Sequence, residues 1–279
     1  MKDRPLIINV VPTGAVSDPS RNPNVPVTLE AIVADVAQAA QAGASIAHLH
    51  IRDGEGKPSC DPEQYGELLA RLRDLGSCAG LILGASTSGR HGQSLEERAA
   101  VLRLPADRRP DMASLTLGDV QFPQDVSRNS PADIRFLASA MRDAEVKPEL
   151  EIFDLGMLRM AVELANEELI HPPYYFNFIL GNFVGLQPEI GELARAFALL
   201  PPDSLVSLGG IGRKQFYSNA LGVLLADGVR VGLEDNLWSE FSPRQAATNP
   251  GLVSGVAQLA RTLRRPIASR QETRAFLGL

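Results

Sequence analysis

Short apolar runs alternate with helical segments along the whole 279-residue chain, and this alternation constrains the fold more than any other feature. Apolar strands that alternate with helices are typical of a parallel sheet buried under helices. We predict strands at 6–11, 46–51, 81–86, 112–117, 148–153, 174–180, 205–208 and 229–233. We predict helices at 29–42, 62–75, 95–102, 131–144, 156–168, 190–199, 214–226, 251–264 and 270–277.

This pattern predicts an α/β protein, specifically a (β/α)8 TIM barrel with C-terminal helices, because eight strand–helix repeats in a chain of this length match that fold. No linker or low-complexity segment interrupts residues 1–279, so we expect a single domain. A doubly wound open sheet is the alternative, but no G-x-G-x-x-G follows the first strand. In a barrel, catalytic groups collect at the carboxyl ends of the strands.

Composition excludes several classes of protein. A net charge of −6 argues against a general nucleic-acid-binding protein. Cys60 and Cys78 are the only cysteines, which predicts neither a disulfide framework nor a thiolate metal site. No apolar run approaches the roughly 20 residues that span a bilayer, and the N-terminus does not resemble a signal peptide. We therefore expect a cytoplasmic protein with no membrane partner and no nucleic-acid partner.

Two histidines, His48 and His50, stand two positions apart in the predicted strand 46–51. Side chains of a strand alternate, so both imidazoles project from one face. Neutral imidazole is the commonest metal ligand, although an H-x-H pair alone is a short pattern. The pair therefore indicates either a metal site or two hydrogen-bonded histidines that line a polar cleft.

The last predicted strand supplies a third ligand candidate. Arg230, Gly232 and Glu234 share one face of it, and Asp235 follows directly. In a closed barrel the first strand lies between the second and the eighth, which brings Glu234 toward the histidines. Two imidazoles, one carboxylate and an open position form a catalytic zinc or non-haem iron site. The alternative is that Glu234 pairs with Arg230 or Arg52, but we favour the metal because three ligands meet on one face.

Further polar residues end the other strands and are candidates for supporting roles. A metal-bound histidine commonly donates its second N–H to a carboxylate, a role open to Glu151. For Glu149 we favour an ion pair with an arginine of the barrel. The remaining strand-end candidates are Ser86, Ser114, Thr116 and Asn177.

Five segments carry a resemblance to a known family: Val-Pro-Thr-Gly-Ala at 11–15, His-Leu-His-Ile-Arg-Asp at 48–53, Pro-Glu-Leu-Glu at 148–151, Gly-Gly-Ile-Gly-Arg at 209–213 and Arg-Val-Gly-Leu-Glu-Asp-Asn at 230–236. Over nearly its whole length the chain resembles the β-keto acid cleavage enzymes. The resemblance implies a zinc-bearing (β/α)8 barrel, generally a homo-oligomer, with a tetramer favoured. It also implies a retro-Claisen-type condensation in which a β-keto acid and acetyl-CoA become acetoacetate and a new acyl-CoA.

The resemblance also implies roles for single residues. His48, His50 and Glu234 correspond to the zinc ligands. Arg230 and Asp235 correspond to the pair that deprotonates the substrate. Ser86 matches a family serine and is predicted to be catalytic, and the residues predicted to bind substrate are Thr13, Ser114, Thr116 and Glu151.

The sequence departs from the family member that acts on an amino-substituted keto acid. That enzyme has a glutamate where this chain has Val16, so we predict a substrate without a primary ammonium group near the first loop. Thr116 replaces the usual asparagine, and Ser88 replaces a glycine. The loop 209–214 either helps to bind CoA or only makes a tight turn.

Two other functions compete with this interpretation. The first is another metal-dependent barrel enzyme, an amidohydrolase or an aldolase-like lyase. Amidohydrolases use further histidines, but His91 and His171 do not lie at suitable strand ends. The second is a barrel kept only for assembly or ligand binding, and the full set of metal and acid–base residues argues against it.

Overall fold

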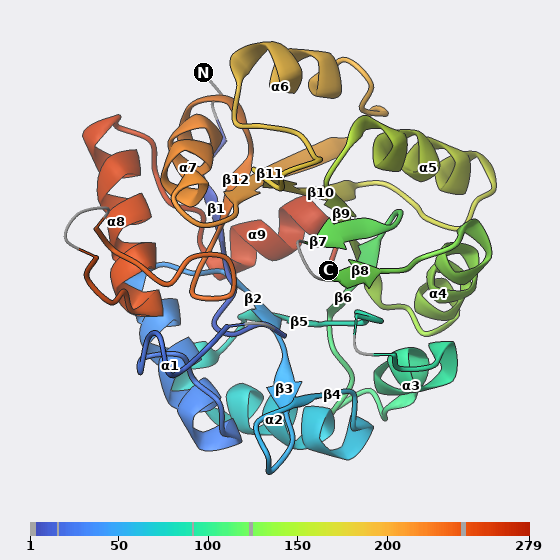
Figure 1. The fold of residues 1–279 in the computed structure, drawn as a ribbon, viewed down its shortest axis with the longest axis horizontal. Helices are drawn as coiled ribbons and strands as arrows, with labels where there is room; N and C mark the ends of the chain where they lie inside the picture. The colour runs from blue at the N-terminus through green and yellow to red at the C-terminus, as the bar shows by residue number, and fades with distance from the viewer. Residues whose placement is uncertain (1–3, 16, 91, 123–124, 241–243) are drawn as a thin grey trace.

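The computed structural model describes residues 4–15, 17–90, 92–122, 125–240 and 244–279. Its main sheet is a closed barrel of parallel strands in the order β1-β12-β11-β10-β9-β6-β5-β2 (Figure 1). The predicted barrel is confirmed, including the placement of β1 between β2 and β12. The barrel strands are β1 (Ile7–Val10), β2 (Ile46–Leu49), β5 (Ile82–Ala85), β6 (Met112–Thr116), β9 (Lys147–Ile152), β10 (Tyr174–Leu180), β11 (Ser204–Gly210) and β12 (Gly228–Val231).

Helices surround the barrel, as Figure 1 shows. They are α1 (Leu29–Ala42), α2 (Pro62–Asp74), α3 (Leu95–Ala99), α4 (Pro131–Asp143), α5 (Leu155–Asn166), α6 (Ile190–Phe197), α7 (Lys214–Leu225), α8 (Asn249–Thr262) and α9 (Arg270–Leu277). Short 3-10 helices lie at η1 (Gly76–Cys78) and η2 (Ala100–Arg103), and η2 takes the second half of the predicted helix 95–102. Among the described residues, no helix combines the length and the apolarity that a membrane crossing requires.

Side-chain caps set where several helices begin. Thr28 caps α1, and Ser94 caps α3 through the predicted capping box with Glu97. Ser130 caps α4 in the same way. Each cap satisfies backbone N–H groups that the first turn leaves without partners. These local signals therefore fix the residue at which each of the three helices begins.

The amino-terminal end of the barrel is closed by apolar packing. Ile7, Ile46 and Ile82 point inward from the strand starts and pack with Leu277 of α9. In Figure 1 this helix is seen through the middle of the barrel. With that end filled, the polar residues gather at the carboxyl ends of the strands.

Two small antiparallel hairpins extend the barrel strands beyond their carboxyl ends. The first pairs β3 (Ile51–Arg52) with β4 (Pro58–Ser59), so the predicted strand 46–51 is broken at His50. The second pairs β7 (Val120–Phe122) with β8 (Asp125–Ser127). The sequence analysis predicted neither hairpin.

Candidate active site

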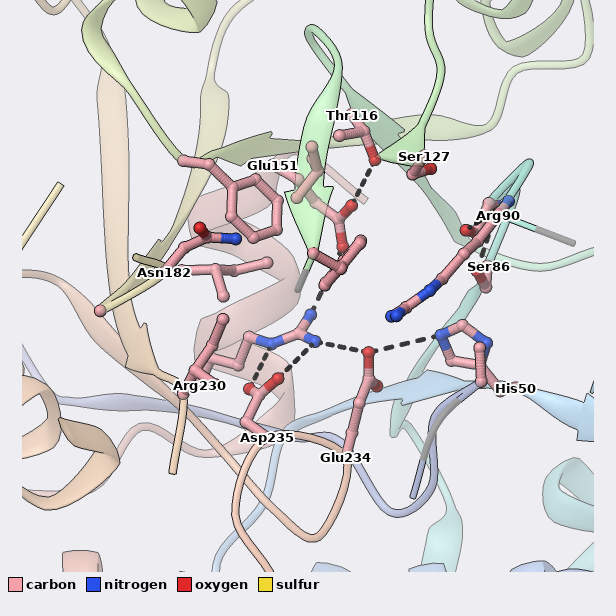
Figure 2. A pocket seen from close by; sticks show the side chains of 18 of the residues that line it. His50, Ser86, Arg90, Thr116, Ser127, Glu151, Asn182, Arg230, Glu234 and Asp235 are labelled. Carbon is pink, nitrogen blue, oxygen red and sulfur yellow. Dashed lines mark hydrogen bonds and ion pairs between the residues drawn. The ribbon is translucent and has the colours of Figure 1, made fainter. Parts of the chain in front are cut away.

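A cavity of about 450 Å³ opens at the carboxyl ends of the barrel strands. Its polar lining residues include His50, Ser86, Thr116, Glu151, Glu234 and Asp235 (Figure 2). Its apolar lining residues include Val120, Phe122, Phe153, Ile179, Phe183 and Ile211. A concave site with an apolar wall and a few convergent polar groups is typical of a small-molecule binding site.

Three side chains converge beside this cavity with the spacing of metal ligands. The Nε2 atoms of His48 and His50 lie 3.2 Å apart. Glu234 Oε1 lies 3.5 Å from His50 Nε2, and its Oε2 lies 3.9 Å from His48 Nε2. Ligand atoms bound at about 2.0–2.1 Å in a tetrahedron lie roughly 3.3 Å apart. The three residues therefore fit a divalent metal with little rearrangement, and among the described residues they form the one such cluster.

The tautomer of His48 is set by a buried carboxylate on the opposite side of the ring. Glu149 Oε2 lies 2.7 Å from His48 Nδ1 and accepts its proton in a hydrogen bond. Asn9 and Asn177 donate to the other oxygen of Glu149 at 2.6 and 2.7 Å. Burial raises the pKa of Glu149, but His48, Arg230 and Asn9 outweigh it and hold this pKa below its usual value. Nε2 of His48 is therefore left as a lone-pair donor toward Glu234.

The charges around the three ligands attract a cation. Burial opposes protonation of His48, but Glu149 and Glu234 outweigh it and raise the pKa of His48 to about 9. Burial also raises the pKa of Glu234, but Arg230 and the two histidines lower it well below its usual value. Glu234 Oε2 is buried and has no hydrogen-bond partner among the described residues. A buried carboxylate oxygen without a partner is costly, and a metal ion would satisfy it.

Arg230 connects three carboxylates at the bottom of the cavity. Its Nε and Nη2 donate to both oxygens of Asp235, at 2.8 and 3.2 Å. Nη2 also donates to Glu234 at 2.7 Å, and Nη1 lies 3.5 Å from Glu151 (Figure 2). Glu234 can therefore pair with Arg230 through Oε1 and still offer Oε2 to a metal ion, so the two predicted roles of Glu234 are compatible. Arg52, the other partner considered for Glu234, donates instead to the backbone oxygens of Gly14 and Ser17.

Asp235 combines a fixed orientation with a raised pKa. Burial raises the pKa of Asp235, and Arg230 only partly opposes this effect. The bidentate contact with Arg230 holds both oxygens of the carboxylate in place. A base whose pKa is shifted toward neutral pH accepts a proton more effectively than an ordinary aspartate.

Two glycines allow these charged side chains to approach the backbone. A Cβ atom at Gly14 would lie 2.4 Å from Cγ of Glu234. A Cβ atom at Gly209 would lie 2.8 Å from Cβ of Arg230. In the loop 209–214 the first glycine therefore makes room for Arg230, and Gly212 adopts a positive φ of 60° in the turn before α7. These facts explain the glycines, and a role of this loop in CoA binding stays a prediction.

The other predicted site residues fall into two groups. Ser86, Thr116 and Glu151 line the cavity, and the Thr116 hydroxyl donates to Glu151 at 2.6 Å. Thr13 and Ser114 are buried and do not line it. Ser114 Oγ accepts a hydrogen bond from the Thr87 backbone at 3.0 Å, so it supports the loop after β5. The assignment of these two residues to substrate binding stays a prediction.

The roles predicted for the two glutamates of β9 are exchanged. Glu149, expected to pair with an arginine, is the carboxylate that orients His48. Glu151, expected as a candidate for that role, lies beside Arg230 and Thr116 instead. Glu149 lies one inward-facing position earlier on β9, at the level of Asn9 and Asn177, which also bind it. Glu151 lies nearer the carboxyl end of the strand and reaches the cavity.

Some residues of the cavity were not predicted as site residues. Arg90 lines it and lies over the ring of Phe122, with 3.5 Å from the guanidinium carbon to the ring centroid. Ser127 and Asn182 line it as well. The sequence offers one signal for Arg90: this arginine ends the run of small polar residues that follows the predicted strand 81–86. Val16 and His91 lie outside the described residues.

Comparison with known proteins now decides the family. The sequence profile of the beta-keto acid cleavage enzyme family matches residues 5–279. The chain belongs to this family. A 3-keto-5-aminohexanoate cleavage enzyme of Acetoanaerobium sticklandii is 35% identical over 275 residues, covering 98% of each chain. A 3-oxoadipate:acetyl-CoA acetyltransferase of Cupriavidus necator is 36% identical over 279 residues, covering 99% of this chain and 95% of the relative.

The family tolerates different substrates on one scaffold. A relative from Rhizobium meliloti, a 3-dehydrocarnitine:acetyl-CoA trimethylamine transferase, is 30% identical over 294 residues, covering 99% of this chain and 97% of the relative. Among solved structures, ObcA in a ternary complex with a C4-CoA adduct and oxalate matches with a TM-score of 0.77 at 22% identity. That match covers 92% of this chain and 68% of ObcA, and it supports the barrel fold.

Proposed function

We propose that this chain is a zinc-dependent acyltransferase that converts a β-keto acid and acetyl-CoA into acetoacetate and a new acyl-CoA. The observation that carries the proposal is the convergence of His48, His50 and Glu234 beside the Arg230–Asp235 pair. Family membership supports it, as do the names of relatives that use acetyl-CoA. A cytoplasmic location and a homo-oligomer remain predictions.

His48, His50 and Glu234 would hold the metal through Nε2, Nε2 and Oε2. When bound, it supplies a Lewis acid that stabilises negative charge on the ketone oxygen of the substrate, a contribution of several kcal/mol. The hydrogen bond to Glu149 fixes the proton of the neutral His48 ring on Nδ1, so that Nε2 would face the metal, and Arg230 orients the carboxylate of Glu234. Zinc is the ion that we propose, since two imidazoles and one carboxylate form one of its catalytic ligand sets.

Asp235 is the proposed general base. It removes a proton from C2 of the β-keto acid, and Arg230 fixes the direction of the receiving oxygen. The Asp235 side chain is only 7% exposed, and this low exposure strengthens its contact with Arg230. The proton stays on Asp235 while the C2 carbanion reacts.

The remaining steps conserve every atom. The C2 carbanion attacks the thioester carbonyl of acetyl-CoA, and a C–C bond forms as the CoA thiolate leaves. The thiolate then attacks the original ketone carbon, and the bond between that carbon and C2 breaks. The electron pair returns to C2, which takes the proton back from Asp235. The products are acetoacetate and an acyl-CoA that carries the R group of the substrate.

A product assay tests this function directly. Purified protein is incubated with acetyl-CoA and a panel of β-keto acids, and the new acyl-CoA is identified by mass spectrometry. We expect an acyl-CoA whose mass matches the R group supplied, with an equal amount of acetoacetate. Formation of no acyl-CoA from any β-keto acid by metal-loaded protein would refute the proposal.

The same preparation tests the metal. We expect about one zinc per chain by elemental analysis, and His48→Ala should lose metal and activity together. A His48→Ala variant that keeps full zinc would contradict the ligand assignment.

A further inference from the structure

A partly buried arginine faces the cavity from the loop after β5. The side chain of Arg90 is 15% exposed, and Figure 2 shows its guanidinium group directed into the pocket. Nε of Arg90 is buried and has no hydrogen-bond partner among the described residues. The nearest carboxylate is Asp125, 3.8 Å from Nε and half exposed to solvent.

The position of Arg90 is fixed by the hairpin that follows β6. The ring of Phe122 on β7 lies under the guanidinium carbon at 3.5 Å, and Asp125 belongs to β8 of the same hairpin. Burial lowers the pKa of Arg90, and Asp125 opposes this effect. An arginine side chain remains charged in proteins, so the group is a fixed cation against an apolar wall.

The other charges that line the cavity are already matched. Arg230 is shared by Glu151, Glu234 and Asp235 at distances of 3.5 Å or less. Within the described part of the lining, Arg90 is therefore the cation that retains free donors. A guanidinium offers two parallel N–H groups that match a carboxylate, and the apolar surroundings strengthen such a pair.

We propose that Arg90 binds a carboxylate at the end of the substrate remote from C1, so that this enzyme prefers β-keto acids with a second, distal carboxylate. This inference rests on the proposed function and specifies its substrate class. It is compatible with the prediction that the substrate lacks an ammonium group, because a cation would be repelled by Arg90.

The geometry favours the distal end over the carboxylate that all β-keto acids share. The C1 carboxylate adjoins the carbon that Asp235 deprotonates, so it lies beside the ligand cluster. Arg90 does not come within ion-pair distance of Asp235, Glu234 or Glu151. It is held instead by the hairpin that lies beyond the strand ends, where an R group directed away from the ligand cluster would extend.

A pair of substrates of equal chain length isolates this contact. We would measure kcat/KM with 3-oxoadipate, which has a distal carboxylate, and with 3-oxohexanoate, which has a methyl group there. The wild-type enzyme should prefer 3-oxoadipate, and Arg90→Gln should lower its kcat/KM about 10²-fold, the loss expected for a charge-assisted bidentate pair. The value for 3-oxohexanoate should change less than about threefold.

One control variant and one charge-reversal variant accompany the test. Arg103→Gln removes an exposed arginine that pairs with Glu96 and should change neither substrate. Arg90→Glu should remove the preference for 3-oxoadipate and improve 3-keto-5-aminohexanoate, whose ammonium group would then find a carboxylate.

Failure of the Arg90 inference can be distinguished from failure of the proposed function. An equal loss with both substrates would place Arg90 on the shared C1 carboxylate, and a rise only in the KM for acetyl-CoA would place it on CoA. Either result, or a wild-type preference for 3-oxohexanoate, would overturn the inference while the proposed function stands. Absence of acyl-CoA from every β-keto acid would instead be a failure of the proposed function.

Discussion

The imidazole of His48 donates from Nδ1 to Oε2 of Glu149 across 2.7 Å, and both side chains are buried. This contact fixes which nitrogen faces the metal site. Glu149→Gln keeps the shape of the side chain but removes its charge and allows its amide to face the wrong way. We expect metal affinity to fall by about 10- to 100-fold, the usual cost of losing a carboxylate that supports a ligating histidine.

A competition titration with a zinc-binding dye measures this change. Glu63→Gln is a suitable control, because Glu63 is 81% exposed on α2 and is not part of the ligand cluster. Unchanged zinc affinity in Glu149→Gln would show that His48 does not depend on this carboxylate.

Asp235→Asn should separate the proton transfer from metal binding. The asparagine keeps an oxygen for Arg230 but cannot accept a proton. Because a positioned general base contributes about 10²–10⁴-fold, we expect kcat to fall by that factor while zinc content stays at the wild-type level. Steady-state kinetics and elemental analysis of one preparation give both values. Near-normal turnover would assign the proton transfer to another group.

The convergence of His48, His50 and Glu234 could be predicted from the sequence, because it depends on simple rules. Side chains alternate along β2, and barrel closure places β1 between β2 and β12. These rules place His48, which lies on β2, and Arg230, which lies on β12. His50 follows the end of β2, and Glu234 and Asp235 lie in the turn after β12, so the rules indicate the region of these three residues but not their orientation.

The positions of the residues around the ligand cluster depend on features that cannot be read from the sequence. Alternation shows that Glu149 and Glu151 share a face of β9, but not which of them lies level with His48 across the barrel. That level depends on the stagger between strands. The hairpin strands β7 and β8 are only three residues long, too short for a periodic pattern, so the contact between Phe122 and Arg90 was not predictable.

Gly14→Ala tests the close packing around Glu234. The added methyl would stand 2.4 Å from Cγ of Glu234, so the carboxylate must shift. We expect zinc affinity and kcat/KM each to fall at least about tenfold, because ligands must stay within about 0.5 Å of the productive geometry. Gly54→Ala is the matched control, since nothing lies within 4 Å of the added methyl. Equal behaviour of the two variants would show that the site tolerates a displaced Glu234.

Asp35 on α1 should make the stability of the fold depend on pH. Its Oδ2 accepts a hydrogen bond from Asn249 Nδ2 at 2.7 Å, and Asn249 also binds Pro12 and Leu233 near the active-site loops. Burial raises the pKa of Asp35 to about 7, and Asn249 only partly opposes this effect. In the unfolded chain this carboxyl group has the ordinary aspartate pKa of 3.8.

Between about pH 4 and pH 7 the folded state therefore binds more protons at Asp35 than the unfolded state, and its stability falls as pH rises through this window. Asp35→Asn carries no charge, so it should lessen this fall and be more stable than the wild type at pH 8, by a few kcal/mol at most. Urea unfolding at pH 5 and pH 8 measures the difference. Asp74→Asn, an exposed aspartate of α2, should leave the fall unchanged. Parallel profiles for the wild type and Asp35→Asn would show that Asp35 is ionised in the folded state throughout this range.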